Sequence, residues 1–284
     1  MFQRYKFDAI YAYKAGRGLI AKFGTLESLN SLARQRHSLL THKKIIIMHH
    51  HSHSHSHDIA ADSHPNEGGV KEANRQYFDS QAHHHSGGYE ASPARQLATQ
   101  KAAATILEAV SFDEDKTIVM DYACGTGLLS QQLAPHTKTL IGVDISPKSV
   151  EYYNERVANQ GIPPEEMRAI CTELVERNTS DTDPFDGVEF DVIVCTQAYH
   201  HFEDIDDVTK TLASYLKPGT GVLVVVDMIR HVVVYKGGFE EESIRSAFVD
   251  AAGLQSYSFK PAFQMGWQER KVDLFIATGV RGVA

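Results

Sequence analysis

Short apolar runs alternate with amphipathic stretches along residues 71–284. The apolar runs are rich in Val and Ile and have the length of strands, whereas the stretches between them repeat apolar residues every three or four positions, as helices do. We expect strands at 117–124, 139–146, 167–174, 190–197 and 221–228. Strands that are apolar on both faces must be covered on both sides, so the pattern predicts a parallel sheet in an α/β domain.

The predicted helices have recognisable start and stop signals. Ser146 and Pro147 provide a capping hydroxyl followed by proline at the first helical position, and Gly161 marks the end of that helix. The remaining helices are expected at 127–134, 205–216 and 244–251. The last two strands, which we expect to pair as an antiparallel hairpin, lie at 254–263 and 271–280.

The first 70 residues differ in composition from the rest and are expected to form separate segments. Residues 1–47 contain nine Lys or Arg and two acidic residues, and because the whole chain carries a net charge of −8, the remainder carries −15. This basic leader has the composition of a mitochondrial presequence; alternatively, translation begins at Met48 and the leader lies outside the true gene. Residues 48–70 are rich in His and small polar residues, so we expect a solvated, disordered tail.

Charge and composition narrow the classes of function. The acidic remainder argues against nonspecific nucleic-acid binding, and no apolar run approaches the roughly 18 residues of a membrane span. Cys124, Cys171 and Cys195 form no metal-ligand pair and are expected to be reduced, buried thiols. Asp204 and Asp227 are too few acids for a metal-dependent site, so no metal is expected. We expect a cytoplasmic protein, or a mitochondrial one if the leader is a presequence; the oligomeric state is not predicted.

The stretch MDYACGTGLLS, residues 120–130, is the strongest chemical signal in the chain. It lacks the Gly-Lys-Ser/Thr ending of a phosphate-binding loop, and Ser130 replaces the third glycine of a dinucleotide loop, although one substitution does not exclude NAD. Asp121, four residues before Gly125, would repel a pyrophosphate and attract an ammonium group. Asp144, nineteen residues after Gly125, is placed to accept bonds from ribose hydroxyls. A ligand with ribose, an ammonium group and no phosphates is S-adenosylmethionine.

Four motifs together resemble the class I S-adenosylmethionine-dependent methyltransferases, in particular the UbiE-like or type 11 small-molecule group. They are DYACGTG (121–127), GVDIS (142–146), FDVIVCTQAYHHFED (190–204) and LKPGTGVLVVVD (216–227). The resemblance covers about residues 71–280. It implies a Rossmann-like, doubly wound, seven-stranded sheet, mostly parallel with a C-terminal antiparallel hairpin, in a methyltransferase domain over 71–284. It also implies O- or N-methylation of a small molecule.

The same resemblance assigns cofactor-binding roles by position. Asp144 would bind the ribose, Ile145 would pack on the adenine, and Gln197 would face the site of methyl transfer. Glu173 is a weaker adenine contact, because the family often has Asp directly after the third strand, where this chain has Cys171-Thr172-Glu173. The residues expected around the methionine portion are Asp121, Ala123, Gly125, Thr126 and Gly127.

The resemblance places Tyr199, His200 and His201 where the methyl acceptor would lie. A histidine suits a proton acceptor near neutral pH, so one of the pair is a candidate base; alternatively, both shape the loop through hydrogen bonds. The candidate lid and substrate residues are Tyr77 and Phe78 before the core and His231 and Tyr235 after the fifth strand. A protein or RNA methyltransferase and a noncatalytic cofactor-binding protein remain alternatives.

Overall fold

The computed structural model describes residues 69–82, 92–177, 183–230, 238–267 and 270–283. All of them belong to one compact unit, residues 65–284. The domain boundaries predicted at residues 47 and 70 fall outside these ranges or at their edge. They therefore remain predictions.

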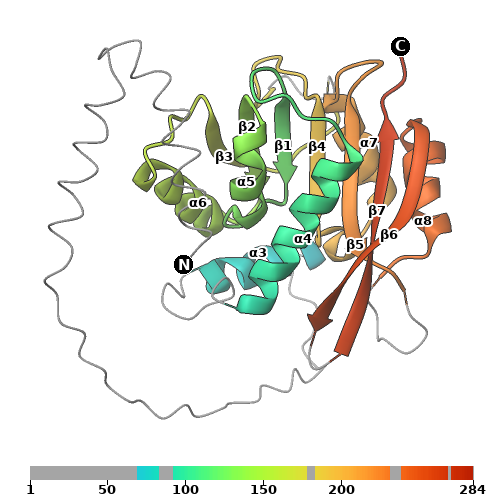
Figure 1. Ribbon diagram of the computed structural model, residues 1–284, viewed down its shortest axis with the longest axis horizontal. Helices are drawn as coiled ribbons and strands as arrows, with labels where there is room; N and C mark the ends of the chain where they lie inside the picture. Colours follow the sequence, from blue (N-terminus) through green and yellow to red (C-terminus); the bar gives the residue numbers. More distant parts are fainter. Residues whose placement is uncertain (1–68, 83–91, 178–182, 231–237, 268–269, 284) are drawn as a thin grey trace, which may run out of the picture. The chain divides into compact units, whose positions relative to one another are not determined.

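A seven-stranded sheet forms the centre of this unit (Figure 1). Its strands are β1 (Ile118–Tyr122), β2 (Thr139–Asp144), β3 (Met167–Cys171), β4 (Val192–Thr196), β5 (Val222–Met228), β6 (Gln255–Trp267) and β7 (Arg270–Val280). The order is β3-β2-β1-β4-β5-β7-β6, and β7 is antiparallel to both β5 and β6 whereas the first five strands are parallel. The predicted strands and the predicted C-terminal hairpin are confirmed.

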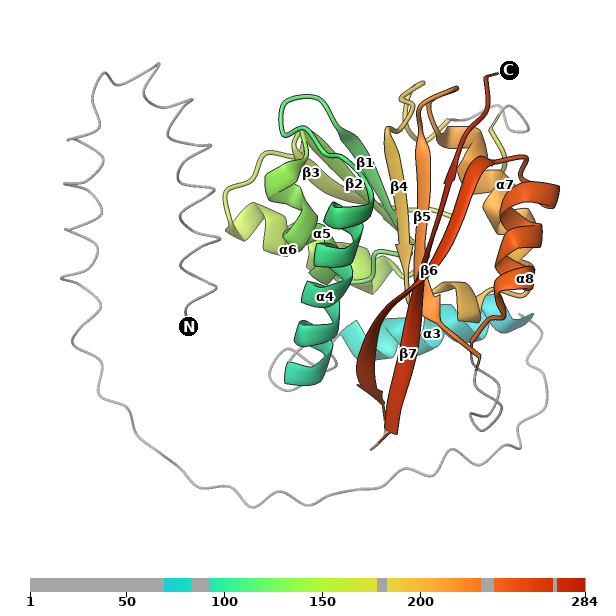
Figure 2. The same ribbon diagram turned by 45° about the vertical axis from the view of Figure 1, so that its right-hand side comes forward.

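Helices cover both faces of the sheet, as Figures 1 and 2 show. The helices are α3 (Gly69–Ala82), α4 (Pro93–Ala109), α5 (Leu128–Leu133), α6 (Pro147–Asn159), α7 (Ile205–Tyr215) and α8 (Glu241–Arg245), the last continuing into a π-helical turn, η4 (Ser246–Ala251). Helices α4 and α5 pack on one face, in a cluster with β1 and β4 residues, and α7 and η4 pack on the other. The predicted doubly wound architecture is therefore confirmed.

Helix α4 was not predicted, although it contributes much of one core layer. Its buried residues are Ala98, Ala102, Ala103 and Ile106. Three of these four are alanines, so the helix shows almost no contrast between an apolar and a polar face. Periodicity analysis depends on that contrast. The helix was missed because it packs closely through small side chains.

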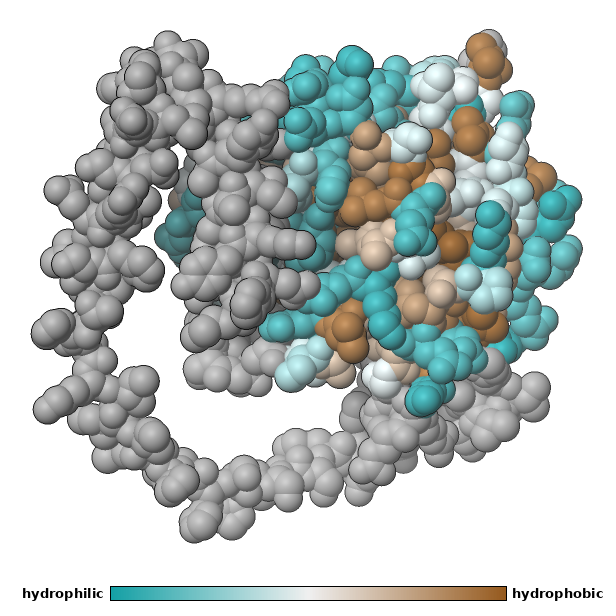
Figure 3. All heavy atoms as spheres, viewed as in Figure 1, coloured by the Kyte–Doolittle hydropathy of each residue, from teal (hydrophilic) through white to brown (hydrophobic). Residues whose placement is uncertain are grey.

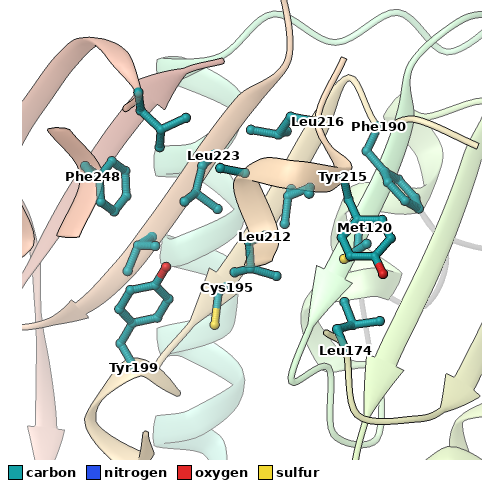
Figure 4. Packing of buried hydrophobic residues seen from close by; sticks show 14 of the residues in the cluster. Met120, Leu174, Phe190, Cys195, Tyr199, Leu212, Tyr215, Leu216, Leu223 and Phe248 are labelled. Atoms are coloured by element: carbon teal, nitrogen blue, oxygen red, sulfur yellow. The ribbon is translucent and has the colours of Figure 1, made fainter. Parts of the chain in front are cut away.

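The second core layer lies between β1, β4, β5 and α7, and part of it is seen in Figure 4. Cys195 lies in this layer with no exposed surface, and burial raises the pKa of its thiol. Cys124 is half-buried, whereas Cys171 is exposed. The prediction that all three thiols are buried is wrong at Cys171, because β3 is an edge strand and Cys171 is its last residue.

The exposed large hydrophobic residues of the described ranges are Val70, Tyr77, Leu97, Val175 and Val283. In Figure 3, hydrophobic residues gather over α4 and the C-terminal strands and are interspersed with hydrophilic ones. No helix within the described ranges combines the length and the hydropathy that crossing a membrane requires.

Candidate cofactor and methyl-transfer site

The carboxyl ends of β1, β2 and β4 open onto a cavity of about 750 Å³. This is within the roughly 300–1,000 Å³ range of small-molecule sites. It also lies where the strand order reverses between β1 and β4, the usual place for ligands in such sheets. The predicted residues that line it are Phe78, Asp121, Ala123, Gly125, Thr126, Asp144, Ile145, Glu173, Gln197 and His201.

The loop after β1 has an unusual backbone. Ala123, Gly125 and Gly127 have φ angles of 56°, 52° and 85°, in the left-handed region that glycine tolerates best. A Cβ atom at Gly127 would lie 2.5 Å from the Tyr153 ring of α6. Gly127 is not among the residues that line the cavity. The sequence prediction gave it a cofactor role, whereas its geometry supports close packing of the loop against α6.

Asp121 carries a buried carboxyl group at the base of the cavity. The residue is 2% exposed, and Ser130 Oγ donates a hydrogen bond of 2.5 Å to its Oδ2 atom. Burial raises the pKa of Asp121 to about 7, and the nearby Asp144 carboxylate also raises it. A cation that binds beside this group stabilises its ionised form. The positively charged ligand group that the sequence predicts at Asp121 would therefore stabilise the ionised carboxylate.

Asp144 connects the end of β2 to the glycine loop. The Gly125 amide donates to Asp144 Oδ2 and the Ser146 amide donates to Oδ1, each at 2.8 Å. Burial raises the pKa of Asp144, and these two amides act in the opposite direction. Each carboxylate oxygen accepts more than one bond, so this arrangement leaves acceptor capacity for ribose hydroxyls. The sequence indicated the ribose role; the connection to the loop was not predicted.

Helix α3 lies along the cavity and contacts both of its ends. At one end, Ser146 Oγ donates to Asp79 Oδ1 at 2.6 Å, next to the expected ribose site. At the other, Asn74 Nδ2 donates to the carbonyl oxygen of His201 at 3.0 Å. Phe78 lines the cavity between them, whereas Tyr77 is 50% exposed and is not part of the lining. Only Phe78 of the two candidate lid residues is therefore placed to contact a ligand.

Charged residues lie on the side of the cavity where the adenine is expected. Glu173 lines it, and Lys71 Nζ of α3 lies 2.6 Å from Glu173 Oε1. Both side chains are more than half exposed, so this ion pair contributes little stability. Ile145, from the end of β2, provides apolar surface on the same side.

Residues 199–201 form one turn of 3₁₀ helix, η3 (Tyr199–His201), after β4. Gln197 lies between the end of β4 and this turn, and its φ of 52° allows the chain to change direction there. Tyr199 has no exposed surface, and its hydroxyl lies 3.2 Å from Thr209 Oγ1 in the core seen in Figure 4. The prediction that Tyr199 contacts the acceptor is wrong, because its place in the turn directs it into the protein interior.

The two histidines of η3 have different surroundings. His201 lines the cavity, and its ring centroid lies 5.4 Å from that of Phe78. The pKa of His201 is lowered to about 4, mainly by burial and also by a charge on His200. His200 Nδ1 instead lies 2.9 Å from Oδ1 of Asp227, at the end of β5. His201 is therefore a neutral side chain of the cavity wall, and His200 is paired with a carboxylate.

Several residues of the cavity wall were missed by sequence reasoning. Arg95 and Thr99 come from α4, Gln131 from α5, and Phe202 from the end of η3. Burial lowers the pKa of Arg95 to about 10. The Gln131 Nε2 atom is buried and has no hydrogen-bond partner within the described ranges. Their only sequence signal was the spacing of four between Arg95 and Thr99, on a helix that was not predicted.

Two predicted acceptor residues, His231 and Tyr235, lie outside the described residues. Within the described ranges, no three His, Cys, Asp or Glu side chains are grouped to hold a metal ion.

Comparisons with known proteins agree with this geometry. Residues 120–225 match the family model described as a methyltransferase domain. The chain is 37% identical over 150 residues to an uncharacterised methyltransferase of Schizosaccharomyces pombe, covering 47% of this chain and 52% of that protein. It is 31% identical over 101 residues to a ubiquinone biosynthesis O-methyltransferase of Coxiella burnetii, covering 36% of this chain and 39% of that protein. The chain thus spans about half, or less, of these relatives.

A similar solved structure is magnesium protoporphyrin IX methyltransferase from Synechocystis PCC 6803 with bound S-adenosylhomocysteine. The TM-score is 0.55 at 17% identity, covering 74% of this chain and 99% of that one, so this likeness concerns the fold. Fold, motifs and family model therefore agree: residues 120–225 match a methyltransferase domain of the type 11 family, within a fold shared with a solved methyltransferase.

Proposed function

We propose that this protein methylates a hydroxyl or amine group of a small molecule. The observation that carries the proposal is that one cavity is lined by two groups of residues. The first group comprises expected cofactor residues, such as Asp121 and Asp144, and the second comprises Gln197 and His201, which are expected near the site of methyl transfer. A protein or RNA acceptor is the second candidate, and it would need a docking surface outside the cavity. The acidic charge of residues 48–284 also favours a small molecule over RNA.

The residues of the cavity fit S-adenosyl-L-methionine as the cofactor. Asp121 offers a buried carboxyl group to its ammonium group, and Asp144 offers acceptors to its ribose hydroxyls. The buried Gln131 Nε2 donor suits its carboxylate, because an unpaired buried donor costs about 1–3 kcal/mol unless a ligand binds it. The positive charge of the Arg95 guanidinium, which also lines the cavity, favours the same carboxylate. When bound, S-adenosylmethionine supplies an activated methyl group.

The protein's own contribution is alignment and proton removal. Alignment of two reactants can supply roughly 7–11 kcal/mol of such a barrier. A hydroxyl or ammonium acceptor must also lose a proton, and the histidines of η3 are the candidate bases at this end of the cavity. Phe78 and Phe202 give the same cavity apolar wall surface.

The test is a methylation screen with labelled cofactor against metabolite extract, purified protein and RNA. We expect label in the small-molecule fraction. The Asp144→Ala variant, which loses a ribose acceptor, serves as the binding-deficient control, and exposed Asp250→Ala serves as the matched control. Label that appears only in protein or RNA would contradict the proposal.

A further inference from the structure

Asp227 is a buried carboxylate at the carboxyl end of β5. It has no exposed surface. Its Oδ1 atom accepts a hydrogen bond of 2.7 Å from the Met228 amide and lies 2.9 Å from His200 Nδ1. Its Oδ2 atom lies 3.2 Å from the same nitrogen and 3.4 Å from the His200 amide. A carboxylate in the core is costly unless it is paired, and His200 is the side chain that pairs with it.

This contact determines which nitrogen of His200 carries a proton. An ionised carboxylate only accepts hydrogen bonds, so Nδ1 must be the donor and carry the hydrogen. In a neutral imidazole the other nitrogen, Nε2, then holds the lone pair and is able to accept a proton. The His200 side chain remains 16% exposed. His200 does not itself line the cavity, but its ring lies against that of His201, which does.

The two histidines differ in burial and in the charged groups beside them. A proton on His200 produces an imidazolium beside the Asp227 carboxylate. Burial lowers the pKa of His201 to about 4, with His200 acting in the same direction. The two ring centroids are 4.1 Å apart, so both rings cannot be charged at low cost. His200 is the member of the pair that lies beside a carboxylate.

We propose that Asp227 is a positioning residue that fixes His200 with Nδ1 protonated, so that Nε2 accepts the proton of the methyl acceptor. This inference rests on the proposed function and selects His200 as the base. The acceptor's O–H or N–H bond breaks and an N–H bond forms at Nε2. In the same reaction the acceptor gains the methyl group as the carbon–sulfur bond breaks, and His200 then releases its proton to water. His201 remains a neutral wall residue.

The first test is nuclear magnetic resonance of full-length, ¹⁵N-histidine-labelled protein saturated with S-adenosylhomocysteine. The His200 signals are identified by their loss in His200→Asn. We expect wild-type His200 to be the Nδ1-protonated tautomer. In Asp227→Asn, the amide can donate to Nδ1, so the Nε2-protonated form should appear. A wild-type His200 protonated at Nε2 would overturn the proposal, and so would an unchanged tautomer in a folded Asp227→Asn variant. The wild-type result is decisive even if the variant does not fold.

The second test uses an acceptor identified by the labelled-cofactor screen. We expect Asp227→Asn to lower kcat about 10- to 100-fold, with KM and S-adenosylhomocysteine affinity little changed, because proton removal is affected and binding is not. The matched control is exposed Asp250→Asn. If His201→Asn abolishes turnover while Asp227→Asn does not, His201 is the base and the inference is wrong. If no small molecule is methylated, the proposed function fails, whereas the tautomer measurement still judges the role of Asp227 in orienting His200.

Discussion

At the scale of single residues, Asp121 has the most direct connection between structure and function. Its pKa is raised to about 7, mainly by burial. The folded protein therefore holds this proton more tightly than the unfolded chain. As the pH rises from about 4 to about 7, the free protein should lose stability, because the charged form is the costly one in the empty site. A bound ammonium group has the opposite effect, because it favours the ionised form of Asp121.

The first prediction concerns the pH dependence of cofactor affinity. Because the ammonium group of S-adenosylhomocysteine favours ionised Asp121, its affinity should rise between about pH 5 and about pH 7, by at most about tenfold per pH unit. Asp121→Asn stays neutral and should lose this dependence, while Asp250→Asn should retain it. Calorimetry at a series of pH values provides the measurement. Affinity that is independent of pH in the wild type would contradict the role of Asp121.

The residues that sequence reasoning identified are those in short linear motifs. Asp121 and Asp144 were recognisable because both are acidic residues at characteristic distances in sequence from the glycine loop. Arg95 and Gln131 reach the cavity only through the packing of α4 against α5, which no local pattern records. Asp227 was considered on its own only as a possible metal ligand. Its contact with His200 joins the end of β5 to the turn after β4, and it forms because these two strands are neighbours in the sheet.

At the scale of elements, close packing of the glycine loop on α6 maintains the shape of the cofactor site. A Cβ atom at Gly127 would approach the Tyr153 ring to 2.5 Å. Gly161 also has a positive φ, of 72°, but has open space around it. The two glycines therefore separate the effect of a clash from that of backbone strain.

The second prediction uses this pair. Gly127→Ala should destabilise the protein by about 2–4 kcal/mol, since it combines strain with overpacking. Gly161→Ala should cost about 1 kcal/mol, from strain alone. Urea unfolding of both variants measures the difference. Equal losses of stability would show that the approach of the loop to α6 is not close.

The third prediction concerns the attachment of α3 to the site. Asp79 accepts hydrogen bonds from Ser146 Oγ and, at 3.3 Å, from the Lys148 amide. Asp79→Ala should loosen α3 over the cavity by about 1 kcal/mol, which lowers S-adenosylhomocysteine affinity roughly fivefold. Hydrogen exchange along residues 69–82 should become faster at the same time. Unchanged exchange and affinity, as expected for Asp250→Ala, would show that α3 is held by other contacts.

At the scale of the whole molecule, the alternation of apolar runs and amphipathic segments was sufficient to predict the sheet and most helices. Each strand buried on both faces has a continuous apolar sequence, as in β5. The exceptions were α4, whose alanine-rich face has no contrast, and Cys171, whose exposure depends on strand order. Strand order is a property of the assembled sheet, so a local pattern cannot reveal it.

The fourth prediction addresses the first part of the chain. We propose that residues 71–284 hold all the catalytic machinery and that the protein acts in the cytoplasm. Deletion of residues 1–60 should leave the Tm and S-adenosylhomocysteine affinity unchanged, because the composition of this part does not favour a core. Loss of folding would refute the domain assignment. Sequencing the mature N-terminus from cells separates a cytoplasmic protein from one processed on entry to mitochondria.

We propose that methyl transfer to a small molecule takes place in the cavity at the ends of β1, β2 and β4. The most direct measurement counts products: labelled S-adenosylmethionine, wild-type protein and metabolite extract are incubated, and both products are quantified. We expect one S-adenosylhomocysteine for each methylated small molecule, with both lost together in Asp144→Ala. Label found only in macromolecules, or tight cofactor binding with no methylated product from any extract, would contradict the proposal.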